Sequence, residues 1–287
     1  MPIRVSTVIR FATAMLWAGA GEAACAPEYP FEFHDGLIWL KVHARESDRP
    51  LNFLLDSGAG VSTVNLPTAE KLGLKRGSRV TVRGVGATMT GRWPTFLSGT
   101  PDSIPLPEKF LSVDLSELSR ACQCRVDGLL GVDFFGAHTV RIDFAARKIR
   151  LLAPGSLANN GKALPLEMIH NALLTPVRVN RGKLQWVRLD TGCAAALHWV
   201  TAGARPEKCR RELSIALTKV LLPVTETDVQ LGEYKFAATP TRLHEKEIFA
   251  GEAGLLGNGI LSRFKAVTID AQSGRMLLET AAEPVVR

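Results

Sequence analysis

The sequence predicts an all-β protein that consists of two homologous units and has a few short helices. Short runs in which apolar and polar residues alternate recur along the chain, and Gly, Pro, Asn and Asp separate them. Long runs with helical spacing are few. The chain has 287 residues, of which 46% are hydrophobic and 22% charged, values that are typical of a globular protein.

The elements follow from these runs in chain order. An apolar run at 51–55 predicts a strand that leads into a core, and "LPTAEKLGL" (66–74) predicts a short helix that ends at Gly73. Further strands are predicted at 36–44, 79–86, 139–144 and 148–152, and the same pattern returns within 174–190, 225–243 and 265–279.

Two motifs occur twice. "LNFLLDSGAG" (51–60) is echoed by "LQWVRLDTGC" (184–193), and the segment that begins "GLLGVDFF" (128–152) is echoed by the one that begins "GLLGNGIL" (254–278). Two similar units of roughly 125 residues therefore follow each other, a period too long for a solenoid.

The repeat divides the chain. We expect one unit at 27–152, a second at 165–287, and a linker at 153–164 that is rich in Pro, Gly and Asn. Residues 1–26 combine a basic start, a short apolar stretch and small residues, which predicts a signal peptide and export. A lipid anchor at Cys25 is the less favoured alternative, because Glu22 stands where such signals have Leu.

The composition and the spacing of charged residues and histidines argue against several classes of function. The net charge is +7, but Lys and Arg are scattered, and there is neither zinc-finger spacing nor an aromatic-basic stripe, so nucleic acid is not an expected partner. No apolar run is long enough to span a membrane. The six His residues lack ligand spacing, so we expect no metal. Four cysteines, if all are oxidised, allow three pairings, and burial as small apolar side chains is the alternative: Cys122, Cys124, Cys193 and Cys209.

Each unit places an aspartate at the end of an apolar strand, before a hydroxyl residue and a glycine. These are Asp56 and Asp190, and each unit later supplies an apolar-apolar-Gly segment, at 129–131 and 255–257. A carboxylate at the edge of a core is costly unless it has a partner. If the units pair about a pseudo-two-fold axis, the two carboxyl groups meet and share a proton, and they can activate a water between them.

These motifs resemble the aspartic proteases, most closely the bacterial retropepsin-like branch. The resemblance covers nearly all of the presumed mature chain and implies two retropepsin-like β-barrel lobes in a pepsin-like bilobal arrangement. It also implies a single-chain monomer and no cofactor, while the predicted signal peptide implies a place in the periplasm or outside the cell. It assigns the catalytic pair to Asp56 and Asp190, and the supporting loops to Ser57, Gly58, Ala59, Thr191, Gly192 and Cys193. The family's flap corresponds to 82–93, with Gly84, Val85 and Gly86 as candidates. No similar Gly-rich hairpin is visible in the second unit, so one flap is expected.

Three residues depart from the family pattern. Cys193 stands where Ala, Ser or Thr is usual, and pairing with Cys209 would shift the neighbouring Asp190. Arg188 stands where an apolar residue is common, and we expect it to reach solvent. Ala59 lacks a hydroxyl that would donate to the first carboxylate, which predicts a pH optimum of roughly 4.5 to 6.5.

The predicted function is that of an aspartic endopeptidase, which hydrolyses peptide bonds of a peptide or unfolded protein. The alternative is a protein of the same fold that binds a peptide or protein without cleaving it. Asp143 and Asp270 also repeat, but each precedes a turn, so a structural role is expected for both. Asp133 has no counterpart in the second unit, which has Gly259 there, so it is expected to be structural or a surface residue.

Overall fold

The computed structural model describes the chain at 26–84, 87–153, 163–201, 210–215 and 219–280. Most of these residues lie in strands and few in helices, so the predicted all-β class is confirmed. The four helices are short: α1 (Leu66–Lys71), α2 (Ser116–Ala121), α3 (Val132–Ala137) and α4 (Asn258–Leu261). None of the described helices is long and apolar enough to cross a membrane.

The first half of the chain forms one sheet, called here the N-terminal sheet. Its strands are, in the order in which they lie side by side, β2 (Glu32–His34), β3 (Leu37–Val42), β4 (Leu51–Leu55), β9 (Gly128–Leu130), β5 (Thr63–Asn65), β8 (Phe110–Val113), β7 (Ala87–Thr95) and β6 (Arg76–Gly84). Most pairs are antiparallel, but β4 pairs with β9, and β5 with β8, in parallel.

The second half forms the C-terminal sheet in the same way. Its strands are, again in spatial order, β13 (Glu167–Ile169), β14 (Ala172–Val179), β15 (Leu184–Asp190), β20 (Gly254–Gly257), β16 (Leu197–Val200), β19 (Tyr234–His244), β18 (Lys219–Leu231) and β17 (Arg210–Ile215). The parallel pairs are β15 with β20 and β16 with β19. Strand order and direction therefore match the N-terminal sheet position by position, and the repeated motifs occupy equivalent places.

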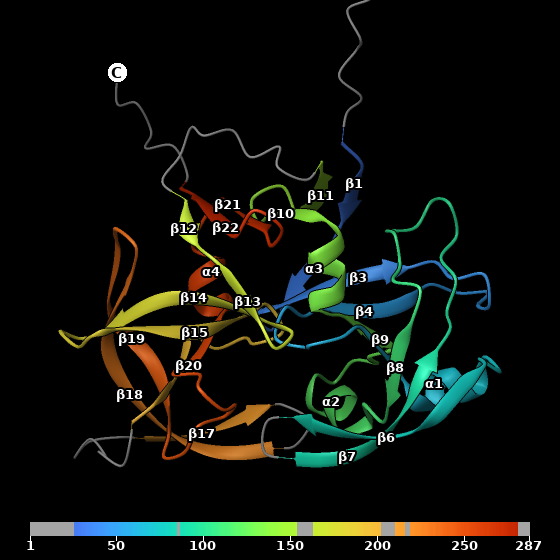
Figure 1. Cartoon of the computed structure of the whole chain (residues 1–287), viewed down its shortest axis with the longest axis horizontal. Coiled ribbons are helices and arrows are strands. Elements are labelled where there is room, and N and C mark those ends of the chain that lie inside the picture. Colours follow the sequence, from blue (N-terminus) through green and yellow to red (C-terminus); the bar gives the residue numbers. More distant parts are fainter. Residues whose placement is uncertain (1–25, 85–86, 154–162, 202–209, 216–218, 281–287) are drawn as a thin grey trace, which may run out of the picture.

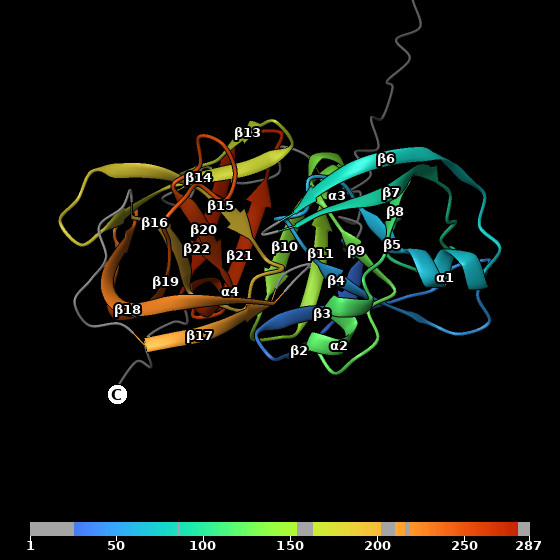
Figure 2. The same cartoon turned by 90° about the horizontal axis from the view of Figure 1, so that it is seen from below.

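A third sheet, the shared sheet, joins the two halves. Its order is β1 (Glu28–Pro30), β11 (Lys148–Leu152), β10 (Thr139–Asp143), β21 (Ala266–Asp270), β22 (Arg275–Glu279) and β12 (Leu164–Pro165). β10 and β21, one from each half, pair antiparallel at its centre. Figure 1 shows this sheet above the other two, and Figure 2 shows β10, β11 and β21 between them.

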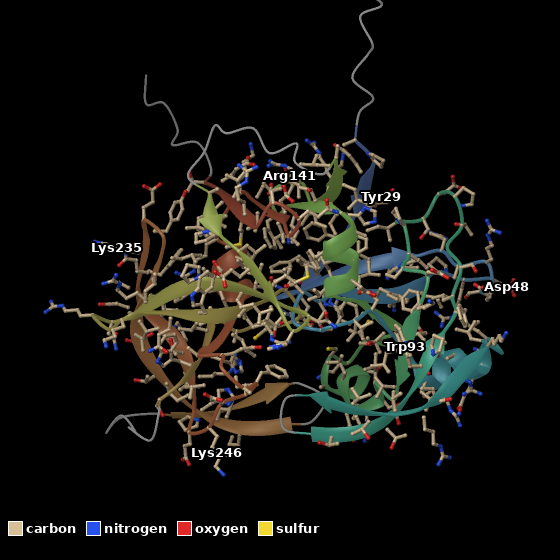
Figure 3. All side chains as sticks on the ribbon, in the orientation of Figure 1. Tyr29, Asp48, Trp93, Arg141, Lys235 and Lys246 are labelled. Carbon is tan, nitrogen blue, oxygen red and sulfur yellow. The ribbon has the colours of Figure 1, made fainter. Side chains whose placement is uncertain are left out.

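Apolar side chains explain why these segments are strands. In β4 four of the five residues are buried, as expected for a strand that is covered on both faces. Phe53 and Leu55 of β4 belong to a core cluster that continues through the shared sheet into the second half, to Leu189 and Ile269. Figure 3 shows the side chains filling the space between the sheets, with Arg141 on the shared sheet.

The helix at 66–74 is confirmed as α1, which has Pro at its start and is followed by Gly73 at φ +63°. The linker prediction differs at one end, because Leu164 already belongs to β12, where it pairs with Met276. Residues 154–162 of the linker, and residues 1–25 with the predicted signal peptide and Cys25, lie outside the described residues.

Candidate active site

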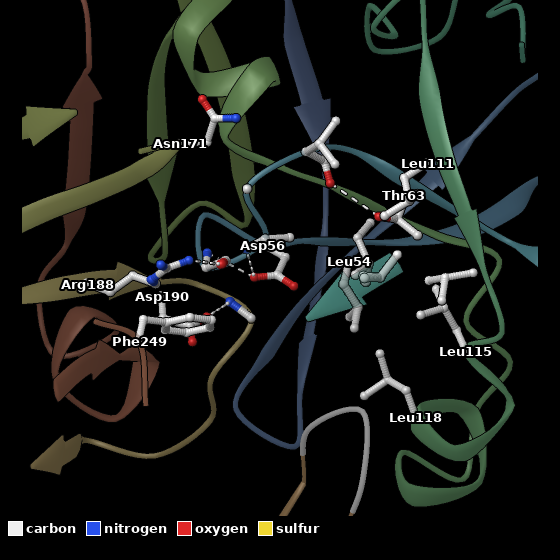
Figure 4. Close-up of a pocket in the computed structure, with 18 of the residues that line it drawn as sticks. Leu54, Asp56, Thr63, Leu111, Leu115, Leu118, Asn171, Arg188, Asp190 and Phe249 are labelled. Carbon is white, nitrogen blue, oxygen red and sulfur yellow. Dashed lines mark hydrogen bonds between the residues drawn. The ribbon is translucent and has the colours of Figure 1, made fainter. Parts of the chain in front are cut away.

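The two aspartates lie at equivalent strand ends. Asp56 directly follows β4, and Asp190 is the last residue of β15. Each of these strands pairs in parallel with the strand of the second repeated motif, β9 or β20. The backbone N–H of Asp56 donates to the carbonyl of Leu130 at 2.9 Å, just where β4 ends. The matching topology thus brings both carboxyl groups to the place where the two halves meet (Figure 4).

Glycines let the two turns approach each other. A Cβ atom on Gly58 would lie 2.7 Å from Oδ2 of Asp190, and one on Gly192 would lie 2.8 Å from Oδ2 of Asp56. Both distances are shorter than those that a real Cβ atom makes. Each glycine therefore packs against the carboxyl group of the opposite turn, and the absence of a side chain is required at both positions.

The hydroxyl residues of the two turns hold them together by reciprocal hydrogen bonds. The backbone N–H of Ser57 donates to Thr191 Oγ1 at 2.9 Å, and that of Thr191 donates to Ser57 Oγ at 3.0 Å. Ser57 Oγ in turn donates to the carbonyl of Leu189, and Thr191 Oγ1 to that of Leu55, both at 2.8 Å. Both hydroxyl residues are completely buried. The four bonds fix the turns in register with each other and with the strands that precede them.

The carboxyl groups have different donors. Asp56 Oδ1 accepts from the backbone N–H groups of Gly58 at 3.0 Å and Ala59 at 3.1 Å. Asp190 Oδ1 accepts from the backbone N–H of Gly192 at 3.0 Å. Because N–H donors favour the ionised form of a carboxyl group, they stabilise a negative charge on Asp56 more than on Asp190.

Burial raises the pKa of both carboxyl groups above the ordinary value. The negative charge of Asp56 raises the pKa of Asp190 further, to well above the ordinary range, while Arg188 lowers the pKa of both. A hydrogen bond between the two carboxyl groups lowers the pKa of Asp56 and raises that of Asp190. When the pair holds one proton, these contacts favour the proton on Asp190 and the charge on Asp56.

The prediction that Arg188 reaches solvent is wrong. Arg188 is only 7% exposed and forms a two-pronged ion pair with Glu252, with Nη2–Oε1 at 2.6 Å and Nε–Oε2 at 2.8 Å. Its Nη1 donates to the carbonyl of Gly58 at 2.8 Å, and its guanidinium lies 3.8 Å from the ring centre of Phe249. Side chains two residues apart on a strand point to the same face, so Arg188 shares the face of Asp190 rather than facing solvent.

A cavity of about 630 Å³ opens at the two carboxyl groups. The first half contributes a mainly apolar wall, which includes Leu54, Val80, Val82, Trp93, Leu111, Val113, Leu115, Leu118 and Leu129. The second half contributes more polar side chains, which include His170, Asn171, Arg188, Cys193 and His198. An apolar cavity with a few convergent polar groups is typical of a ligand site.

The hairpin predicted as a flap is present as β6 and β7, which pair antiparallel from Arg76 to Thr95. Gly84 ends β6 and pairs with Ala87, whereas Val85 and Gly86 lie outside the described residues. Val80 and Val82 of this hairpin line the cavity.

The second half also contains a hairpin, while the expectation of one flap stays a prediction. In the second half β17 and β18 also pair antiparallel, from Arg210 with Val224 to Ile215 with Lys219. No glycine occurs in the segment 210–224, so the glycine pattern by which the first hairpin was recognised is missing there.

Cys193 is a free thiol, as are Cys122 and Cys124, so pairing of Cys193 with Cys209 is not observed; Cys209 itself lies outside the described residues. Burial, reinforced by the charge of Asp190, raises the pKa of Cys193 far above its ordinary value. The thiol therefore stays protonated and adds no charge beside the carboxyl pair.

The three other aspartates singled out in the sequence have structural contacts, as predicted, and two of them cap turns. Asp143 Oδ1 accepts from the backbone N–H of Ala146 at 2.8 Å, and Asp270 Oδ1 from that of Ser273 at 3.1 Å. Asp133 Oδ1 accepts from the backbone N–H and the hydroxyl of Ser62, at 2.8 and 2.6 Å, and so fixes the end of the Asp56 loop.

Two contributors were missed by the sequence analysis. Asn258 is buried at the start of α4, and its Nδ2 donates to the carbonyls of Thr191 at 2.7 Å and Gly36 at 2.8 Å, which links the second turn to the first half. Glu252 lies two residues before the repeated "GLLG" and holds Arg188. A comparison of the two repeats could have identified these residues as unusual. The first half has Val132 at the position of Asn258, and Leu54 at the position of Arg188.

The arrangement can place a water molecule between one charged and one protonated carboxyl group, with backbone donors fixing the charged one. No curated protein matches the chain. Residues 42–134 match the model of a protein family described as aspartyl protease. The matched segment contains Asp56 with its turn, the β6–β7 hairpin and the first "GLLG". This segment is therefore similar to the aspartyl protease family.

Proposed function

We propose that the protein is an aspartic endopeptidase, in which Asp56 and Asp190 activate a water molecule for attack on a peptide bond. The observation that carries the proposal is the reciprocal packing of the two turns, in which each carboxyl group lies against the glycine of the other. On this view the two sheets with equal strand order are the two lobes of a bilobal protease that acts as a monomer, after export from the cytoplasm.

The mechanism follows from the unequal carboxyl groups. Ionised Asp56 accepts a proton from the water, and the protonated Asp190 donates a hydrogen bond to the scissile carbonyl, whose oxygen gains negative charge in the transition state. The proton taken up by the pair then passes to the amine that leaves. The raised pKa of Asp190 supports this assignment of the acid.

The substrate in this proposal is an extended peptide. An extended chain can add to the edges of the β6–β7 hairpin by backbone hydrogen bonds, while its side chains enter the cavity. The apolar wall contributed by the first half favours a large apolar side chain on that side of the scissile bond.

The test is cleavage of an unfolded protein and a peptide library between about pH 3.5 and 7.5. Asp56→Asn and Asp190→Asn should each reduce kcat/KM by ~10³-fold or more, because each removes one member of the acid–base pair. Asp48→Asn, on an exposed residue, is the matched control and should keep full activity. Peptide binding without cleavage by the folded wild type would favour the binding protein instead.

A further inference from the structure

Arg188 has no counterpart in the first half. Leu54 pairs with Leu129 in the N-terminal sheet, and Arg188 pairs with Leu255, the equivalent of Leu129, in the C-terminal sheet. Leu54 therefore occupies the position of Arg188 beside the other aspartate, and it cannot donate a hydrogen bond. The two halves therefore differ in charge at the position two residues before each aspartate.

The guanidinium of Arg188 is fixed on three sides. Glu252 binds Nε and Nη2, the carbonyl of Gly58 binds Nη1, and the ring of Phe249 covers the flat face. Figure 4 shows Arg188, Phe249 and Asp190 together, with Asp56 beside them. A planar group held in this way keeps one orientation, so its hydrogen bond to Gly58 has a fixed geometry.

This hydrogen bond leads directly to Asp56. The carbonyl of Gly58 and the N–H of Ala59 belong to one peptide group. That N–H is shared between Asp56 Oδ1 and the backbone carbonyl of Asp56, both at 3.1 Å. A donor on the carbonyl side of a peptide group polarises it and strengthens its N–H as a donor, because hydrogen bonds in a chain reinforce one another. Arg188 thus acts on Asp56 through a single peptide group, from the opposite half of the chain.

The equivalent carbonyl in the other turn is that of Gly192. Asn258 instead donates to the preceding carbonyl, that of Thr191. The N–H of the peptide group that follows Gly192, that of Cys193, donates to the backbone carbonyl of Asp190 at 3.2 Å. The N–H of Ala59 reaches the carboxyl group of Asp56 as well as its backbone carbonyl, so the bond to the carboxyl group through this peptide is found on the Asp56 side.

We propose that Arg188 is a positioning residue that keeps Asp56, rather than Asp190, as the ionised member of the pair. Glu252 partly neutralises the positive charge of Arg188. For catalysis this rests on the proposed protease function, but the ionisation itself is measurable without cleavage. Arg188 takes over the stabilising role that a hydroxyl at Ala59 would have on the first carboxylate.

The charge of Arg188 acts on both carboxyl groups, so the preference for Asp56 rests on the hydrogen bond to Gly58 and not on the charge alone. Arg188 lowers the pKa of both carboxyl groups. The other titratable groups that line the cavity are Cys193, His198 and His170. The Cys193 thiol stays protonated, and burial with the nearby His244 and Arg242 lowers the pKa of His198 to about 3, so that it is neutral at higher pH. Beside the two aspartates, Arg188 is thus the permanently charged group that lines the cavity, and Glu252 is its ion-pair partner.

The experiment compares two changes with opposite expected signs. Arg188→Met with Glu252→Met removes the ion pair without leaving one buried charge, which avoids the large destabilisation expected of either change alone. Both carboxyl pKa values should then rise, and both limbs of the kcat/KM profile should move to higher pH. Glu252→Gln leaves Arg188 uncompensated and should move the limbs to lower pH.

The carboxyl pKa values are read directly by NMR titration of ¹³C-labelled aspartate, in the folded full chain. In Asp190→Asn the remaining Asp56 should titrate at lower pH than Asp190 does in Asp56→Asn. The difference should shrink when Arg188→Met and Glu252→Met are added. Arg188→Lys, which keeps the charge but not the planar contacts, should restore part of the shift.

The matched control is Arg141→Met with Glu279→Met, which removes an ion pair of the same type on the shared sheet. It should leave both the titration and the pH profile unchanged. Equal titration of Asp56 and Asp190 in the single variants, or a pH profile unmoved by loss of Arg188 and Glu252, would overturn the proposal. Absence of any Asp56-dependent cleavage, with the titration as expected, would instead reject the protease function and leave the role of Arg188 intact.

Discussion

At the scale of single residues, the pKa of a carboxyl group depends on the burial, charges and hydrogen bonds around it. Asp190 and Asp270 both end strands of the second half, yet their environments differ. Burial and the charge of Asp56 raise the pKa of Asp190 well above its ordinary value. At Asp270 burial also acts to raise the pKa, but hydrogen bonds from Ser273 outweigh it and leave the pKa below its ordinary value.

The two shifts predict opposite effects on stability. A raised pKa means that the folded protein binds the proton of Asp190 more tightly than the unfolded chain does. As the pH rises above the ordinary pKa of an aspartate, the unfolded chain loses this proton first. The free energy of unfolding therefore falls with rising pH. Asp190→Asn should therefore be more stable than wild type at neutral pH, and the gain should vanish near pH 3. Urea unfolding at several pH values measures it.

Asp270→Asn provides the contrast with the opposite sign. Its lowered pKa contributes stability at neutral pH that is lost as pH falls through the folded value. This variant should be less stable than wild type at neutral pH, with a difference that shrinks in acid. If both variants changed stability equally at every pH, the assigned shifts would be wrong.

At the scale of elements, the two turns after β4 and β15 act as one unit. Each hydroxyl of Ser57 and Thr191 accepts from the backbone of the opposite turn and donates to the carbonyl that ends the opposite strand. Because the residues are fully buried, no solvent can replace a lost partner. The position of either carboxyl group therefore depends on both turns.

Thr191→Val should lower the free energy of unfolding by ~1–3 kcal/mol, because it leaves the N–H of Ser57 and the carbonyl of Leu55 without their partner. Its effect with Ser57→Ala should not be additive, which a double-mutant cycle measures. Under the proposed function kcat/KM should fall as well.

The control is Thr227→Val, which removes a buried hydroxyl contact with Thr241 in the C-terminal sheet. This change should cost stability without loss of kcat/KM. Strict additivity of Ser57→Ala and Thr191→Val would show that the two turns are independent.

At the scale of the whole molecule, the shared sheet couples the halves. β10 and β21 pair from Val140 with Ile269 to Asp143 with Ala266, and the core cluster is continuous across them. A substitution that destabilises one half should therefore also destabilise the other, and the two halves should unfold in one cooperative transition.

Ile269→Ala should lower the free energy of unfolding by ~2–5 kcal/mol, because Ile269 is fully buried in the shared sheet. Hydrogen exchange should show faster opening of β4 and β15 together. Leu184→Ala, at a residue 55% exposed, is the control and should change stability by less than ~0.5 kcal/mol. Selective opening of only the second half would contradict the coupling.

Much of the fold can be predicted from patterns of neighbouring residues in the sequence. The all-β class and α1 were predicted from alternation and turn residues, and the equivalence of Asp56 and Asp190 from the repeated motifs. These predictions succeed because strand alternation, Gly and Pro act over a few residues, and because a repeated sequence folds into a repeated topology. The Gly-free hairpin β17–β18 was missed, since it lacks the local turn signal on which that reasoning depends.

The sequence by itself determined the residues that carry the chemistry: two aspartates, each followed by a hydroxyl residue and a glycine, in two equivalent settings. Only the tertiary structure decided how unequal the two carboxyl groups are. Arg188 and Glu252 are far apart in sequence and meet Gly58 of the other half only after folding, and burial then fixes the order of ionisation. Charges and solvent exclusion act through space, so no local pattern encodes them.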